Sequence, residues 1–156
     1  MMSTTTGRIR RWTLALLTGL FLVGCSDSGT GPGDELAPLV GTWRAQAMVL
    51  TNQASPDTSV DLIQEGASFT LSILATGEYS AALSLLGQTH TELGTIEVSG
   101  SQITITPTTP PGPSTSGTWS LTGGIVYIDG TTEFDFNLDG TDEPADIHIE
   151  LYAVEL

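Results

Sequence analysis

Apolar side chains recur at every second position over most of the chain after residue 39, with polar residues between them. This is the period of a β-strand that buries one of its two faces. The clearest pair of segments is 67–74 and 78–85, which the turn residues Thr76-Gly77 connect. Its alternating apolar positions are Phe69, Leu71, Ile73, Tyr79, Ala81, Leu83 and Leu85. The pattern predicts a β-hairpin here.

The same alternation predicts further strands at 40–50, 95–98, 102–106, 118–121, 125–128, 133–138 and 147–154. Between them we expect short turns at 99–101 and 122–124, and loops at 51–61, 87–92 and 107–116. About nine strands in hairpin order predict an antiparallel sheet, and a sheet of that length in a small domain tends to close. We therefore predict an all-β fold over residues 36–156, a small antiparallel up-and-down barrel of eight or nine strands.

The first 25 residues have a different pattern. Arg8, Arg10 and Arg11 precede an apolar run at 12–23, which is too short to span a membrane. The run ends in Leu22-Val23-Gly24-Cys25, which contains the only cysteine. This arrangement resembles the signal peptide and lipobox of bacterial lipoproteins. The alternative is an ordinary secretory signal with a cysteine nearby by chance.

The lipoprotein resemblance implies that residues 1–24 are removed and that Cys25 is acylated. The acyl chains would bind the lipid bilayer as a stable anchor. Ser26 follows the cysteine, which resembles proteins sorted to the outer membrane. Residues 25–35 are rich in glycine and serine, so we expect a flexible tether.

A second resemblance lies in the folded part. Gly41-Thr42-Trp43 is similar to the Gly-x-Trp motif at the start of lipocalins, and Gly77-Glu78-Tyr79, Gly94-Thr95-Ile96 and Gly117-Thr118-Trp119 repeat the glycine-x-apolar step. No arginine follows Arg44, so the looser lipocalin-like group is the better match. The resemblance implies a barrel whose closed end is filled by Trp43, with Trp119 and Tyr79 in barrel-end packing or in ligand contact. It leaves open whether so small a barrel holds a ligand or is filled by its own side chains.

Charge excludes one class of partner. All 18 acidic residues follow Cys25, whereas Arg44 is the only basic residue after it apart from the two histidines. Such a surface repels polyanions, so we expect no nucleic-acid partner. With one cysteine in the chain, no internal disulfide can form.

The sequence predicts no enzyme. Cys25 is committed to the anchor, and no turn presents a nucleophile beside a histidine. His90 lies in the predicted polar turn at 87–92, and His148 lies on the strand face opposite Ile147 and Ile149. We expect both imidazoles to be solvated surface groups.

Residues 135–146 are the strongest candidate for a metal site. Their sequence resembles the calcium loop D-x-N-x-D-G, in which oxygen ligands alternate around a glycine bend. The candidate Ca²⁺ ligands are Asp135, Asn137, Asp139, Glu143 and Asp146. The alternative is a strand with Phe134, Phe136 and Leu138 facing inward, which ends in a turn at Asp139-Gly140.

Two functions therefore remain open. In the first, a lipid-anchored envelope lipoprotein binds a small apolar or amphipathic ligand inside its barrel. In the second, the barrel is solid, with calcium as an added stabiliser, and its acidic face or the loops at 51–61 and 107–116 contact a protein partner that the sequence does not identify. A cavity of ligand size, roughly 300 Å³ or more, would favour the first function.

Overall fold

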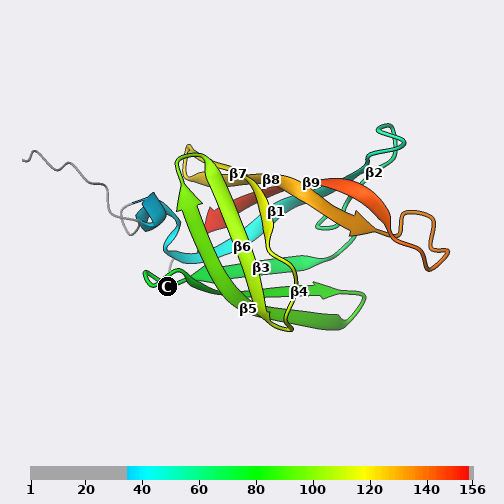
Figure 1. Ribbon diagram of the computed structural model, residues 1–156. Coiled ribbons are helices and arrows are strands. Elements are labelled where there is room, and N and C mark those ends of the chain that lie inside the picture. The colour runs from blue at the N-terminus through cyan, green and yellow to red at the C-terminus, as the bar shows by residue number, and fades with distance from the viewer. Residues whose placement is uncertain (1–34, 155–156) are drawn as a thin grey trace, which may run out of the picture.

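The computed structural model describes residues 35–154, which form one short 3-10 turn and nine β-strands (Figure 1). The turn η1 spans Ala37–Leu39. The strands are β1 (Gly41–Asn52), β2 (Ser59–Asp61), β3 (Ser68–Ile73), β4 (Glu78–Leu85), β5 (Gln88–Ser99), β6 (Gln102–Thr109), β7 (Thr115–Thr122), β8 (Ile125–Phe134) and β9 (Glu143–Ala153).

Eight strands close into an antiparallel barrel, because β1 pairs with β3 on one edge and with β9 on the other. The order around the wall follows the chain, so neighbouring strands are joined by hairpins. Strand β2 is an extra strand on the edge of β1. The predicted all-β antiparallel barrel is confirmed.

The candidate signal peptide at 1–24, the acylation site Cys25 and most of the tether at 25–35 lie outside the described residues. Among residues 35–154, no helix is both long and apolar enough to cross a bilayer.

One end of the barrel, which we call the closed end, is filled by side chains. The chain joins the barrel here through η1, and the turns at 74–77, 99–101 and 122–124 lie at the same end (Figure 1). Leu36 and Leu39 are 5 % and 1 % exposed and pack on a core that includes Trp43, Leu71, Ile103 and Leu151. Dense apolar packing of this kind is the main stabilising term in a chain without disulfides.

At the other end, which we call the open end, the wall divides in two places. Strand β1 pairs with β3 only over Gly41–Arg44, and β6 pairs with β7 only over Gln102–Ile105. Beyond these points the strands separate (Figure 1). Connections at 53–58, 86–87, 110–114 and 135–142 surround this end.

Where β3 separates from β1, the backbone of β1 still has hydrogen-bond partners. After β3 leaves β1, the backbone N–H of Met48 donates to the Asp61 carboxylate at 3.1 Å, and the N–H of Ile63 donates to the same oxygen at 3.0 Å. The Met48 carbonyl accepts from the N–H of Leu62 at 2.9 Å. Met48 is 4 % exposed, so an unpaired N–H there would be costly.

The predictions differ most from the structure in four segments, and all four lie at the open end. The predicted loop at 51–61 contains β2, and the predicted Pro-rich loop at 107–116 is shortened by both flanking strands. The predicted turn at 87–92 belongs almost wholly to β5, so His90 lies in a strand. The predicted strand at 133–138 ends at Phe134, and Leu138 is 87 % exposed rather than inward. In each case the extent of pairing with the neighbouring strand decided the outcome, and local alternation of apolar residues does not report that extent.

Candidate functional site

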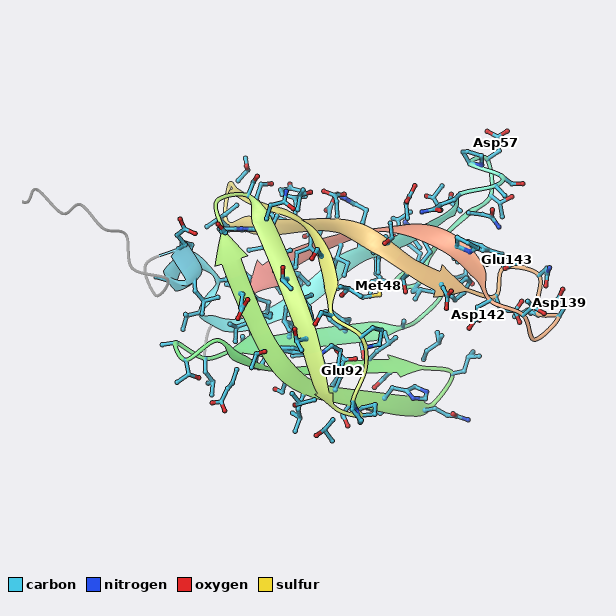
Figure 2. The ribbon with its side chains drawn as sticks, in the orientation of Figure 1. Met48, Asp57, Glu92, Asp139, Asp142 and Glu143 are labelled. Carbon is cyan, nitrogen blue, oxygen red and sulfur yellow. The ribbon has the colours of Figure 1, made fainter. Side chains whose placement is uncertain are left out.

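A cavity of about 530 Å³ occupies the barrel at its open end. Most of its wall is apolar and comes from the inward faces of five strands and from the segment after β2, with Met48, Leu50, Leu62, Phe69, Ala81, Leu83, Leu85, Phe134, Ile147 and Ile149. Figure 2 shows Met48 and Glu92 within the outline of the barrel. Strand β3 separates from β1, and β7 separates from β6, at this end of the barrel. The side chains here therefore leave a hollow rather than a packed core.

The polar part of the cavity wall comes mainly from β5. Glu92 is Cα-paired with Ala81 and His90 with Leu83, so all four side chains face inward. Glu92 is half-buried, whereas His90 is exposed at the mouth. A carboxylate therefore lies beside an apolar hollow.

The Glu92 carboxylate has one hydrogen-bond donor within the described part of the chain. The hydroxyl of Tyr79, a residue only 5 % exposed, donates to Glu92 Oε1 at 2.5 Å. Burial and this hydrogen bond raise the pKa of Tyr79 above its ordinary value, so the hydroxyl stays protonated and remains a donor. The pair is thus a fixed polar group inside the barrel.

Tyr79 reaches Glu92 because the facing position on β5 is a glycine. Gly94 is the Cα partner of Tyr79, and a Cβ built on Gly94 would lie 2.7 Å from Tyr79 Cε1 and 2.2 Å from the carbonyl oxygen of Thr106. Any larger residue at 94 would displace the tyrosine ring or β6. The motif Gly94-Thr95-Ile96 therefore marks a position where β5 lies in close contact with the Tyr79 ring and with β6.

A second hollow of about 410 Å³, which we call the side opening, adjoins the cavity where β6 and β7 separate. The two openings share Glu92, Pro110, Thr132, Ile147 and Ile149. The loop at 110–114, with Pro110, Pro111 and Pro113, lines this side opening. Glu92 is therefore reached from both the mouth and the side.

The two tryptophans among residues 35–154 lie away from this cavity. Trp43 is 6 % exposed in the closed-end core, and its indole N–H donates to the carbonyl of Leu39 at 2.8 Å. Trp119 is half-buried, packs on the same core and donates to the carbonyl of Gly100 at 3.0 Å. Of the three aromatic residues selected from the sequence, only Tyr79 reaches a group that lines the cavity.

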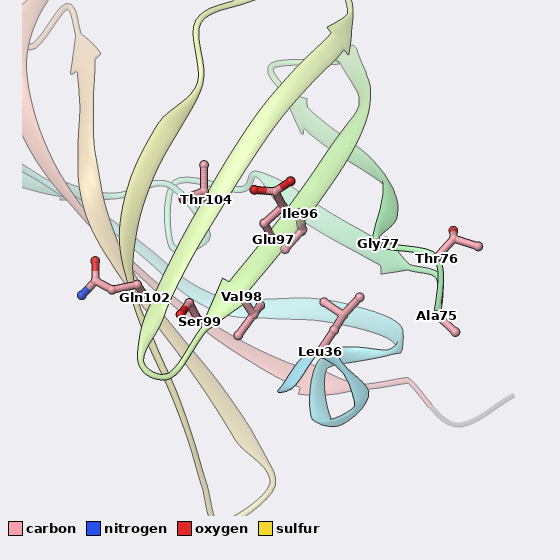
Figure 3. Close-up of a pocket in the computed structure, with 10 residues that line it drawn as sticks. All are labelled: Leu36, Ala75, Thr76, Gly77, Ile96, Glu97, Val98, Ser99, Gln102 and Thr104. Carbon is pink, nitrogen blue, oxygen red and sulfur yellow. The ribbon is translucent and has the colours of Figure 1, made fainter. Parts of the chain in front are cut away.

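A hollow of about 430 Å³ at the closed end lies on the outer surface (Figure 3). It lies between η1 and the β5–β6 hairpin, and Leu36 extends toward Val98. The outward-facing side chains of Glu97, Gln102 and Thr104 line it, so it does not continue into the barrel.

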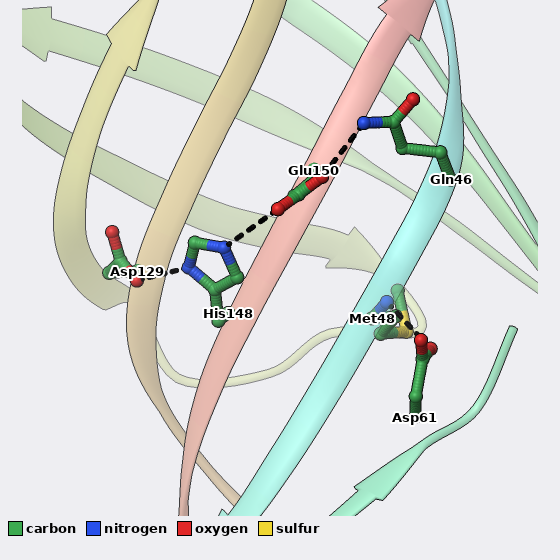
Figure 4. Close-up of polar contacts among 6 residues, drawn as sticks. All are labelled: Gln46, Met48, Asp61, Asp129, His148 and Glu150. Carbon is green, nitrogen blue, oxygen red and sulfur yellow. Dashed lines mark hydrogen bonds and ion pairs between the residues drawn. The ribbon is translucent and has the colours of Figure 1, made fainter. Parts of the chain in front are cut away.

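His148 belongs to an outer-surface cluster (Figure 4). Its Nδ1 lies 2.6 Å from Asp129 Oδ1 and its Nε2 lies 3.6 Å from Glu150, which also accepts a hydrogen bond from Gln46. The hydrogen bond to Asp129 raises the pKa of His148 above its ordinary value, against the opposing effect of partial burial. His148 on β9 and Asp129 on β8 therefore form a cross-strand pair on the outer surface.

The candidate calcium loop is closed by its own hydrogen bonds. Asp135 accepts from the N–H groups of Asp139 and Gly140 at 3.1 and 2.8 Å, and Glu143 accepts from the N–H of Phe136 and the amide of Asn137, both at 2.9 Å. Asp146 instead accepts from Gln53 at 2.8 Å. Among residues 35–154, no group of three or more His, Cys, Asp or Glu side chains is placed to hold a metal ion. Calcium binding at this loop stays a prediction.

Sequence reasoning missed Glu92, the central polar group of the cavity. The signal was present in the strand phase, because Ile96 and Val98 face inward and counting back by two gives Gly94, Glu92 and His90. Their polar side chains suggested a turn instead.

Comparison of the chain with family models, with curated proteins and with solved structures finds no match.

Proposed function

We propose that this protein is a lipid-anchored envelope lipoprotein, held in the outer membrane by acylated Cys25, whose lipocalin-like barrel binds a small apolar or amphipathic ligand. The supporting observation is the cavity of about 530 Å³ with a mainly apolar wall. Ligand pockets commonly measure about 300–1,000 Å³ and combine an apolar lining with few polar groups. The anchor is supported by the motif at residues 22–25.

The proposed activity is binding rather than catalysis. The two histidines lie apart, one at the cavity mouth and one on the outer wall, and His148 contacts carboxylates. Neither contact pairs an imidazole with a hydroxyl or thiol nucleophile, which acyl-transfer chemistry requires.

The test is binding of an uncharged apolar dye, such as N-phenyl-1-naphthylamine, to the chain from Cys25 to the C-terminus with Cys25→Ser. We expect the dye to bind and to fluoresce more strongly in the cavity. Ala81→Phe should abolish binding, because residue 81 lines the cavity and a phenyl ring would fill it.

The matched control is Ala82→Phe on the same strand. Ala82 points to the opposite face of β4, so a ring there leaves the cavity unchanged. Absence of dye binding in the parent protein, or equal binding by both variants, would contradict the proposal.

A second candidate function is a protein contact at the rim of the open end. Leu86 and Leu138 are 91 % and 87 % exposed, and both adopt left-handed backbone conformations with φ of 52° and 59°. Such conformations are unfavourable for leucine, so glycine or asparagine would be expected at these positions. Crosslinking in intact cells with Leu86→Asp and Leu138→Asp tests this contact. Loss of a crosslinked partner with an intact fold would support it, and an unchanged pattern would reject it.

A further inference from the structure

The ionisable groups that line the cavity are carboxylates, apart from the imidazole of His90 at the mouth. Glu92 lines both openings, and Glu133 lies at the rim of the mouth. Neither set of lining residues contains a lysine or arginine. The one arginine among residues 35–154, Arg44, is exposed on β1 next to Trp43 at the closed end.

The Glu92 carboxylate keeps accepting capacity after its bond to Tyr79. An ionised carboxylate offers about four lone-pair sites, and the tyrosine hydroxyl occupies one, on Oε1. The other oxygen carries no protein hydrogen bond among residues 35–154, and the Glu92 side chain borders the mainly apolar wall of the cavity. A carboxylate in that setting is best satisfied by a donor, and most strongly by a charged one.

From these observations we propose that Glu92, held by the Tyr79 hydroxyl, binds the ammonium group of an amphipathic amine whose apolar body fills the cavity. This inference rests on the proposed function and specifies its ligand class. An apolar chain would lie against the side chains of β3, β4, β8 and β9, while its cationic head pairs with Glu92. Anionic amphiphiles such as fatty acids would be disfavoured, because their carboxylate would face Glu92 with no cation between them.

A cationic head group can approach Glu92 from two directions. Glu92 is reached through the side opening as well as through the mouth, and both openings lead to the same apolar wall. The strongly acidic surface would attract cations toward either opening. The same surface field creates the main alternative explanation for any amine preference, so the experiment must separate the two.

The experiment compares three ligands of equal chain length: decylamine, 1-decanol and decanoate. The protein is the chain 25–156 with Cys25→Ser, loaded with the neutral dye. The affinity of each ligand is measured at pH 7, roughly, by its displacement of the dye. We expect the amine to bind about 10-fold or more tightly than the alcohol, the range for a hydrogen bond to a charged group, and decanoate to bind more weakly than the alcohol.

The deciding variant is Glu92→Gln, which keeps the side-chain shape and an oxygen that accepts from Tyr79. The preference for amine over alcohol should fall about 10-fold or more, while alcohol binding stays unchanged. The matched control is Glu97→Gln, which removes an outward-facing carboxylate from the same strand. It should leave the preference intact.

Salt provides a measurement that needs no variant. If the amine contacts the half-buried Glu92 carboxylate, its preference over the alcohol should persist at about 0.5 M NaCl. At that salt concentration the attraction of exposed surface charges is screened. A preference that disappears in salt, or that survives Glu92→Gln, would overturn the inference. If decanol displaces the dye but the amine has no advantage, only this inference fails. If no apolar probe binds at all, the proposed function fails as well.

Discussion

The two ends of this barrel are built from the same eight strands, yet one end is packed throughout, whereas the other has a cavity beside a smaller buried cluster of Met48, Leu50, Leu62 and Ala67. At the closed end Leu71 and Leu151 are 5 % and 0 % exposed, and η1 adds Leu36 and Leu39 to the core. At the open end Leu83 and Leu85, on the strand next to Leu71, are only half-buried and line a cavity. The difference arises where β3 leaves β1 and β7 leaves β6.

This contrast teaches that composition alone does not make a cavity. Leucine, isoleucine and phenylalanine face inward at both ends. What differs is the spacing of the strands that carry them, together with a polar pair, Tyr79 and Glu92, at the boundary. Stability and binding are therefore assigned to different halves of one wall.

The largest expected effect comes from deleting the same side-chain atoms at each end. Leu71→Ala should lower the free energy of unfolding by about 2–5 kcal/mol, because it opens a void in a packed core. Leu83→Ala should cost about 1 kcal/mol, because its side chain is only partly buried and already borders a hollow. Urea denaturation measures both. Equal costs would show that the open end is packed in solution.

An intermediate effect is expected at the division between β1 and β3. Asp61→Ala would leave the N–H groups of Met48 and Ile63 without their acceptor, at a cost of about 1–3 kcal/mol. Asp61→Asn keeps an accepting oxygen and should retain most of the stability. Thermal unfolding of both variants provides the measurement, and similar losses in the two would refute a role for the hydrogen bonds.

The smallest expected effect concerns pH. Asp129 and His148 pair across β8 and β9 at the level where the β7–β8 ladder ends. Because the folded-state pKa of His148 is raised, the stabilisation is fully present below the unfolded value of about 6.5 and is lost as the pH rises through the raised value. The His148 side chain is 40 % exposed, so we expect less than about 1 kcal/mol.

The test compares the melting temperatures of the parent protein and of His148→Gln at roughly pH 5.5 and pH 8.5. The parent should lose its advantage over the variant at the higher pH. A larger advantage at the higher pH would reverse the sign and refute the assignment.

The closed end was predictable from the sequence, and the open end was not. Strand β4 was predicted with its observed bounds, since its inward positions are Tyr79 followed by small and apolar residues. In β5 the inward positions turn polar at His90 and Glu92, so the alternation that identifies a strand is lost where the cavity begins. Strand β2 has only three residues and is defined by its pairing with β1, so it is too short to show an alternating pattern and was missed.

The candidate site shows the same limit. Tyr79 was selected from a glycine-x-apolar step, but its partner Glu92 lies 13 residues away and is joined to it only by the hairpin register. Residues that serve a cavity break the pattern that builds a core. Failure of the alternation was therefore itself a marker of the site.

The divided wall also bears on self-association. Where strands separate they expose backbone edges, which invite pairing with another chain and lead to aggregation. Pro110, Pro111 and Pro113 lie at the side opening, where they have no N–H to offer an incoming strand. With acidic side chains in large excess, copies of the protein also repel one another. The proline loop thus allows a barrel with a gap in its side to remain separate from its neighbours at high local concentration.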